Sequence, residues 1–426
     1  MERNVYEEYI AILKEELVPA MGCTEPISIA YAAAKARQIL GCIPEYVEIE
    51  ASPNIIKNVK SVIVPNTGSL RGIEAAAVAG LVAGQADDEL QVLSKVTGDE
   101  IKLISEYLEK IDCKVKSSDN GYIFYISVSA QANGHSAYVE IAGEHTNIIC
   151  MKKDGETLFS REYTEQKNAY RTDRSLLNVD CIVEFANTVE ISDVEEVIAK
   201  QIECNTAIAE EGLHNNWGAS IGSILLRSYG NSVHNRAKAY AAAGSDARMS
   251  GCEMPVVINS GSGNQGLTAS LPVIVYAKEL GVSKDLMYRA LVVSNLVTIH
   301  LKTGIGPLSA YCGATSAGCG AGAGITYLYG GGTKEISHTV VNALAINSGM
   351  ICDGAKPSCA AKIASAVESG LLGMQMGNHG KEFFGGEGII VKGVENTIRS
   401  IGELARDGMR ETDKLIIKMM TECPCS

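Results

Sequence analysis

Glycine and alanine are concentrated in the second half of this 426-residue chain, and they restrict what it can fold into. From about residue 185, five stretches favour helix: DVEEVIAKQIECNTAIAEEGL, AKAYAAAGSDARM, DLMYRALVVSNLVTIHL, KEISHTVVNALAINSGM and CAAKIASAVESGLLGMQM. Between them lie GSGNQG, KTGIGP, GCGAGAG and YGGGT, which we interpret as joints. Because glycine has no Cβ, such segments permit tight turns and close approach of helices. We therefore predict a closely packed helical domain.

The first half has a different pattern. Two helices are predicted within residues 1–40, and EYVEIEAS, KSVIVP, YIFYISVSAQ and AYVEIAG read as strands. Alternation with period two between turn residues favours antiparallel pairing. The predicted fold class is α+β: a mostly helical catalytic domain plus a smaller mixed α/β domain with largely antiparallel strands. We predict N-terminal helices at 1–42 that join the catalytic unit, an α+β domain at 43–190 and the helical domain at 191–426.

The charge excludes some function classes. A net charge of −13 argues against binding to nucleic acid, which needs clustered Lys and Arg, and against binding to anionic membranes. The start, MERNVYEEYIAILKEEL, lacks the apolar core of a signal peptide, and no stretch is apolar enough for a membrane span. We expect a cytoplasmic protein, whose 13 cysteines are then reduced.

Several cysteines are candidates for chemistry. Cys23 in GCTEP directly precedes a predicted helix, whose dipole would lower its pKa and favour the thiolate; the alternative is a buried structural thiol. Cys352 and Cys359 bracket the loop of ICDGAKPSC. Three roles are open for them: buried apolar residues, a disulfide, or metal ligands. Three loop thiolates with one iron position left open would suit an iron–sulfur cluster, but spacing alone does not select the three.

GSGNQG, residues 261–266, fits the dinucleotide-binding pattern G-x-G-x-x-G after the strand-like PVVIN. Pro272 lies where the helix of that motif should run, and no second βαβ unit follows. We favour a tight loop in which backbone amides and the amides of Asn264 and Gln265 hold an anion such as a carboxylate.

Taken together, the motifs resemble the L-cysteine desulfidase family, which is related to the α chain of iron–sulfur L-serine dehydratases. The resemblance covers residues 15–420 or so, in the expected order. It rests on GCTEPISIAYAAA, SPNIIKNVKSVIVPNTG, DARMSG, GSGNQGLTASLPV, YCG, ITYLYGG, NSGMICDGAKPSCAAKIAS and GMRETDKLI. In VPNTG, Asn66 replaces the glycine that is more usual in the family.

The resemblance implies a [4Fe–4S] cluster held by Cys312, Cys352 and Cys359, with Cys23 as the catalytic base. Cys319 matches no ligand of the family, so we expect it to pack in the core. Cys425 in the tail is a candidate for the open iron, as in related serine dehydratases. An exposed iron implies sensitivity to oxygen.

The implied reaction converts L-cysteine and water to pyruvate, ammonia and sulfide without pyridoxal phosphate. The substrate carboxylate needs amide donors or a cation, and our candidates are Ser52, Lys57, Asn58, Thr67, Gly68, Asn264 and Gln265. L-Serine dehydratase is the nearest alternative function, and a non-catalytic iron–sulfur sensor is the second. The expected partner is a small amino acid, and a homodimer is a candidate assembly.

Overall fold

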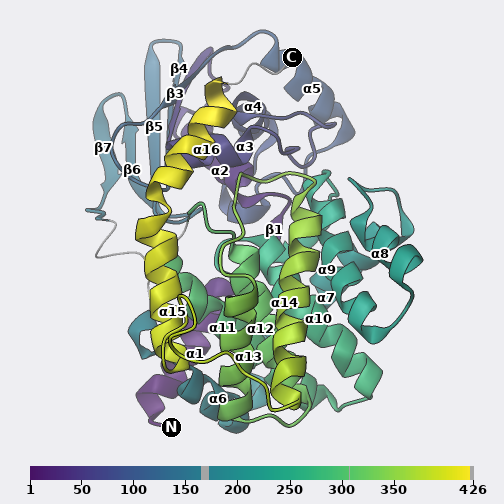
Figure 1. Ribbon diagram of the computed structural model, residues 1–426. Coiled ribbons are helices and arrows are strands. Elements are labelled where there is room, and N and C mark those ends of the chain that lie inside the picture. Colours follow the sequence, from purple (N-terminus) through teal and green to yellow (C-terminus); the bar gives the residue numbers. More distant parts are fainter. Residues whose placement is uncertain (165–171, 307, 423–426) are drawn as a thin grey trace.

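The computed structural model describes residues 1–164, 172–306 and 308–422. A sheet with its own helices lies above a larger layer of helices, and these two parts make up the fold (Figure 1). The predicted α+β class, with a helical part and a smaller, largely antiparallel sheet, is confirmed. Of the helices in the described ranges, none is both long and apolar enough to cross a membrane.

The sheet has six strands in the order β3-β2-β4-β5-β6-β7. Within the residues that the structure describes, β2 and β3 pair in parallel, and the other neighbouring strands are antiparallel. Buried and half-buried positions alternate along β2, because one face of the sheet packs on helices. The strands are β2 (Tyr46–Ala51), β3 (Asp112–Ser117), β4 (Tyr125–Ala132), β5 (His135–Ala142), β6 (Ile148–Lys153) and β7 (Glu156–Ser160).

The alanine-rich helix α2 (Thr24–Leu40) packs on β4, β5 and α4 (Ile73–Ala83). It therefore lies with the sheet, whereas α1 (Arg3–Glu16) packs on α7 (Ile191–His214) of the helical part. The predicted boundaries at 42 and 190 remain predictions. Helix α5 (Gly98–Leu108) starts at a capping box formed by Thr97 and Glu100.

The prediction of a strand at KSVIVP is wrong. These residues, 60–65, follow the short helix α3 (Pro53–Val59). Ser52 is the N-cap of α3, and proline occupies its first position, where the missing N–H costs nothing. The chain then turns through a loop in which Asn66 adopts a φ of 56°. Asparagine tolerates this left-handed conformation better than most residues, so it can stand in for glycine here.

The helical part contains α6 to α15 and the two-stranded ribbon of β1 (Pro19–Met21) with β8 (Pro255–Val257). The ribbon ties the segment before α2 to the segment before α10. The helices are α6 (Val179–Thr188), α7, α8 (Ile221–Tyr229), α9 (Val233–Met249), α10 (Gly263–Leu280), α11 (Lys284–Ile305), α12 (Gly313–Leu328), α13 (Thr333–Ile346), α14 (Cys359–Asn378) and α15 (Val394–Glu403). The 3₁₀ segments are 86–91 and 174–176, and a short π-helix spans 404–408.

GCGAGAG is not a joint, as predicted, but the interior of α12. A Cβ on Gly318 would lie 2.2 Å from the carbonyl oxygen of Ala366, and one on Gly370 would lie 2.1 Å from that of Gly318. Glycine is needed here because the backbones of α12 and α14 touch. Helix α10 likewise continues through Pro272, so that residue was no argument against a helix.

The last helix, α16 (Arg410–Glu422), rises from the helical part to the sheet part, where it packs on α3 (Figure 1). The ammonium of Lys57 lies 2.6 Å from a carboxylate oxygen of Asp413, and the side chain of Lys57 is 1% exposed. The side chain of Lys60 also donates a hydrogen bond to the carbonyl of Met420. Helix α16 therefore fastens the two parts together beside α3.

Candidate active site

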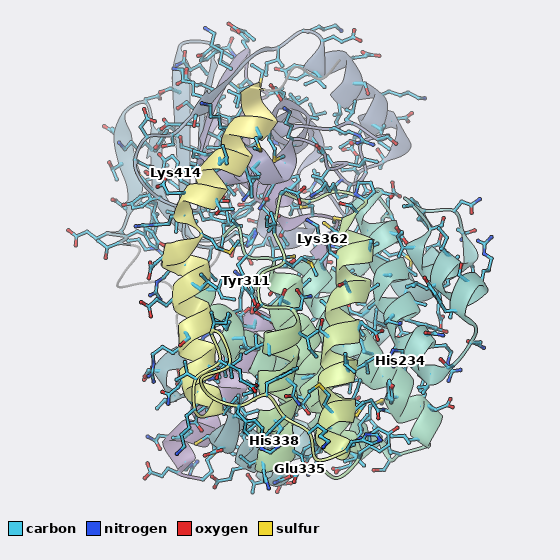
Figure 2. All side chains as sticks on the ribbon, in the orientation of Figure 1. His234, Tyr311, Glu335, His338, Lys362 and Lys414 are labelled. Atoms are coloured by element: carbon cyan, nitrogen blue, oxygen red, sulfur yellow. The ribbon has the colours of Figure 1, made fainter. Side chains whose placement is uncertain are left out.

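A cavity of about 250 Å³ lies where the two parts meet. Its walls come from the start of α2, from α3, from the loop after β5, from α9 and α11, and from the first turns of α10, α12 and α14. Tyr311 and Lys362, two of the lining residues, lie at this level between sheet and helices (Figure 2). The cavity is large enough for a small amino acid.

Four helices begin at this cavity. Their N-cap residues are Cys23 for α2, Ser262 for α10, Cys312 for α12 and Ser358 for α14, and none of them caps its helix through its side chain. The first N–H groups of these helices are thus not satisfied by caps, and the positive ends of four helix dipoles meet. Such a cavity favours anionic groups, including thiolates and carboxylates.

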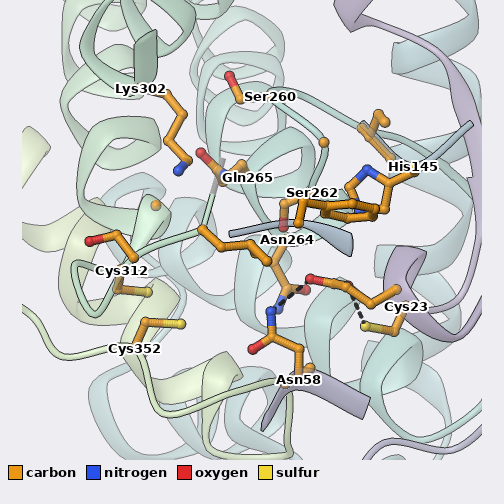
Figure 3. A pocket seen from close by; sticks show the side chains of 18 of the residues that line it. Cys23, Asn58, His145, Ser260, Ser262, Asn264, Gln265, Lys302, Cys312 and Cys352 are labelled. Carbon is orange, nitrogen blue, oxygen red and sulfur yellow. Dashed lines mark hydrogen bonds between the residues drawn. The ribbon is translucent and has the colours of Figure 1, made fainter. Parts of the chain in front are cut away.

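Cys312, Cys352 and Cys359 all line the cavity, although 40 residues separate the first two in sequence. A short antiparallel bridge brings their loops together: the N–H of Cys312 donates to Met350 O at 2.9 Å, and that of Cys352 to Ala310 O at 2.7 Å. Figure 3 shows the thiols of Cys312 and Cys352 side by side. The Cys312 thiol donates to Cys352, and with Lys57 nearby this lowers the pKa of Cys352 against the opposing effect of burial.

The loop between Cys352 and Cys359 lies directly on α3. Gly354 has a φ of 88°, and a Cβ at this position would lie 2.6 Å from the carbonyl oxygen of Lys57. Only glycine combines this conformation with so close an approach. The turn ends as Cys359 opens α14, where burial raises the pKa of its thiol.

These three thiols fit an iron–sulfur group by their chemistry. They are soft donors, and soft thiolate ligands select iron–sulfur clusters or zinc. Among the described residues, no three His, Cys, Asp or Glu side chains are placed to hold a single metal ion. A cluster does not require that, because its cysteines bind different irons. Lys302, whose pKa burial lowers to about 8 while Cys352 and Cys312 oppose the change, adds a cation beside the thiols.

Cys23 lies across the cavity from Cys312 and Cys352 (Figure 3). The prediction that the helix dipole makes it a thiolate is wrong for this state of the protein. Burial and the neighbouring carboxylate of Glu25 raise its pKa well above the ordinary value, and the thiol donates to Glu25 Oε2 at 3.0 Å. The dipole of α2 is outweighed by the loss of water and by a negative neighbour.

Glu25 is the hub of the polar contacts around Cys23. Its other oxygen, Oε1, accepts from Asn58 Nδ2 at 2.9 Å, and both bonds are drawn in Figure 3. Burial opposes ionisation, yet His145, Cys23 and Arg248 lower the pKa of Glu25. Burial also lowers the pKa of His145, so its ring is neutral near pH 7. The carboxylate of Glu25 is thus ionised.

The structure brings together four of the seven predicted substrate-binding residues: Lys57, Asn58, Asn264 and Gln265 line the cavity. The other three lie apart from its lining. Ser52 Oγ donates to Ile123 O at 2.8 Å, and Thr67 Oγ1 donates to Val64 O at 2.7 Å. Gly68 serves a turn with a φ of 68°.

Two further cysteines were singled out from the sequence. Cys319 is 1% exposed within α12, which agrees with the packing role that we predicted. Cys425 lies outside the described residues, so its predicted approach to iron stays a prediction.

Sequence reasoning missed Arg248, Lys302 and His145 as lining residues of the cavity. Arg248 lies near the end of α9 in DARMSG, a motif we used only for the resemblance. Its side chain is buried, with the residue 2% exposed, and such burial of a charge is the signal of function that one sequence does not display.

Comparison with known proteins finds a family and relatives that cover most of the chain. A family profile described as serine dehydratase alpha chain matches residues 87–418. A UPF0597 protein of Desulfitobacterium hafniense is 57% identical over 422 residues, which cover 99% of this chain and 98% of that protein. UPF0597 proteins of Lachnoclostridium phytofermentans and Treponema denticola are 50% and 47% identical, and each alignment covers at least 98% of both chains.

Proposed function

Because the chain belongs to the serine dehydratase alpha chain family and is a dehydratase-type lyase, we propose that it converts L-cysteine and water to pyruvate, ammonia and sulfide. One observation carries this proposal. A cavity of amino-acid size holds Cys23 across from Cys312 and Cys352, and Cys359 also lines it (Figure 3). This arrangement offers a proton acceptor at one end of a substrate and thiolate ligands for a metal group at the other.

The family binds iron–sulfur clusters, and the three cysteines are the proposed ligands of a [4Fe–4S] cluster. When bound, the cluster supplies a Lewis-acidic iron that stabilises sulfide as it departs. The surrounding residues favour this end of the cavity for negative charge: the starts of α12 and α14 point their N–H groups to it, and Lys57 and Lys302 add cations.

At the opposite end, Cys23 is the proposed general base that removes the α proton of the substrate. Cys23 is a thiol in this structure, so its own proton must leave first. Glu25 Oε2, 3.0 Å away, is placed to pass that proton on to water, and Glu25 is again a carboxylate before the substrate binds. The electrons of the Cα–H bond then form the Cα–Cβ double bond as the Cβ–S bond breaks. The resulting 2-aminoacrylate tautomerises to an imine, which water hydrolyses to pyruvate and ammonia.

L-Serine is the second candidate substrate, because the family description names serine dehydratase and the same geometry suits loss of hydroxide. Anaerobically reconstituted protein should be assayed for sulfide and pyruvate from L-cysteine, and for pyruvate from L-serine. We expect the larger kcat/KM for cysteine, and a much larger value for serine would overturn that choice. Cluster-loaded protein that forms pyruvate from neither would favour the sensor.

Variants test the assigned roles. Cys312→Ala, Cys352→Ala and Cys359→Ala should each lower the iron and acid-labile sulfide content after reconstitution. Cys23→Ala should keep both and lose turnover; if it loses iron instead, Cys23 is a ligand rather than a base. Cys319→Ala, on the same helix that Cys312 caps, is the matched control and should keep iron and turnover.

A further inference from the structure

Two opposite charges face the cavity without pairing with each other. Arg248 and Glu25 both line it, yet no ion pair joins them among the described residues. Arg248 nevertheless contributes to lowering the pKa of Glu25. A cavity with separated positive and negative groups matches a ligand that carries both charges.

Of these two charged residues, Arg248 gives the clearer indication of a ligand. The residue is 2% exposed, and its Nε has no hydrogen-bond partner in the part of the chain that the structure describes. A buried guanidinium nitrogen without a partner is costly, and an anion with two oxygens can bind the guanidinium through two parallel hydrogen bonds. A Cβ on Gly263 would lie 2.3 Å from Arg248 Nε, so the guanidinium lies against the first residue of α10. The positive end of that helix therefore reinforces Arg248.

Acceptor oxygens lie at Glu25. Asn58 donates through Nδ2 to Glu25, which fixes the orientation of its amide, and its buried Oδ1 has no partner among the described residues. The ionised carboxylate of Glu25 and this neighbouring oxygen suit an ammonium, which has three N–H donors and no acceptor. Asn264 Oδ1 and Gln265 Oε1 are also buried and unpartnered there, and the amide of Gln265 lies against Gly313 at the start of α12.

We propose that Arg248 binds the α-carboxylate of the substrate, while Glu25 and Asn58 bind its α-ammonium, so that the site selects zwitterionic α-amino acids. This deepens the proposed function and rests on it, since it names how the substrate is held. With the ammonium at Glu25, the α carbon lies near Cys23, and the β substituent is free to extend toward Cys312 and Cys352. The charge pattern excludes 2-hydroxy acids, which lack the ammonium.

Binding of unreactive ligands tests this pattern. L-Alanine has both charges but no leaving group, L-lactate lacks the ammonium and L-alaninamide lacks the carboxylate. Calorimetry on anaerobically reconstituted wild-type protein should give the tightest binding for alanine. Arg248→Gln should weaken alanine binding by at least 30-fold or so, as expected for loss of a buried charge partner, and should leave alaninamide binding unchanged.

Arg236→Gln is the matched control, because Arg236 also lies on α9 but pairs with Glu279 away from the cavity. Its affinity for alanine should equal that of the wild type. Retained alaninamide binding shows that Arg248→Gln is folded, and Arg248→Lys should recover part of the affinity for alanine. Equal weakening of alanine and alaninamide, or no weakening, would overturn the assignment.

The two proposals fail separately. If the wild type forms pyruvate and Arg248→Gln keeps its affinity for alanine, the carboxylate assignment is wrong and the lyase proposal stands. If alanine binds with the expected dependence on Arg248 but neither cysteine nor serine yields pyruvate, the assignment of Arg248 to the carboxylate stands and the lyase proposal is wrong.

Discussion

We expect the contact between α12 and α14 to influence the distance between two of the proposed ligands, because Cys312 directly precedes α12 and Cys359 is the first residue of α14. Gly370→Ala tests this. The new Cβ would lie 2.1 Å from the carbonyl oxygen of Gly318, whereas ordinary contact begins at 3.4 Å, so the helices must separate by about 1.3 Å. The obstacle is backbone and cannot rotate away. Overpacking of this kind costs about 1–3 kcal/mol.

The matched control is Gly377→Ala on the same helix, where the nearest atom to a new Cβ is 3.9 Å away. It should be neutral or stabilising by about 0.4–1 kcal/mol, since alanine restricts the unfolded chain. Thermal unfolding should place Gly370→Ala several degrees below the control, at about 2–4 °C per kcal/mol for a unit of 150–250 residues.

Iron content adds a second readout. Displaced helix starts should reduce iron and acid-labile sulfide per chain in Gly370→Ala and not in Gly377→Ala. If the two variants unfold at the same temperature and retain equal iron, then the glycine contact neither limits the packing nor positions the cysteines, and our reasoning is refuted.

Three other predictions concern stability. Asp413→Asn leaves the ammonium of Lys57 buried without its carboxylate and should lower the free energy of unfolding in urea by about 3 kcal/mol. Adding Lys57→Met should restore part of that stability. If Asp413→Asn loses no stability, α16 is held by other contacts. Burial raises the pKa of Asp246, which accepts hydrogen bonds from the N–H groups of Ile221 and Gly222, to about 6. The folded chain then binds this proton more tightly than the unfolded chain, so the free energy of unfolding falls by roughly 3 kcal/mol as the pH rises from about 4 to above 6. Asp246→Asn should flatten this dependence when unfolding is measured across the same pH range. Cys319→Ala creates only a small void within α12, so it should lower the free energy of unfolding by about 1 kcal/mol; a much larger loss would mean that the thiol does more than pack.

Periodicity was enough to predict the α+β class, since alternating strands and alanine-rich helices leave regular patterns. Periodicity failed for segments whose conformation depends on their contacts in the folded protein. GCGAGAG resembles a flexible joint until the backbone of α14 is known to touch it. KSVIVP has strand-forming residues, but Pro53 starts a helix just before it, and the chain then turns.

The same limit applies to the site. The motif around Cys352 and Cys359 was visible in sequence, and the family resemblance added Cys312. The raised pKa of Cys23 was not visible in the sequence, because it depends on burial and on the carboxylate of Glu25 at 3.0 Å. Arg248 gave no signal either, since a lone arginine in an alanine-rich helix looks like an ordinary exposed residue until its burial is seen.

The ion pair between Lys57 and Asp413 also has a consequence for biosynthesis. The two residues are 356 positions apart, so a ribosome adding about 5–20 residues per second makes them roughly 20–70 s apart. During that interval α3 lacks its partner helix, and the wall of the cavity beside Lys57 is open to solvent. Cys359, the last of the three proposed ligands, precedes Asp413 by 54 positions, so at that rate all three thiols exist for only about 3–11 s before the partner of Lys57 is made.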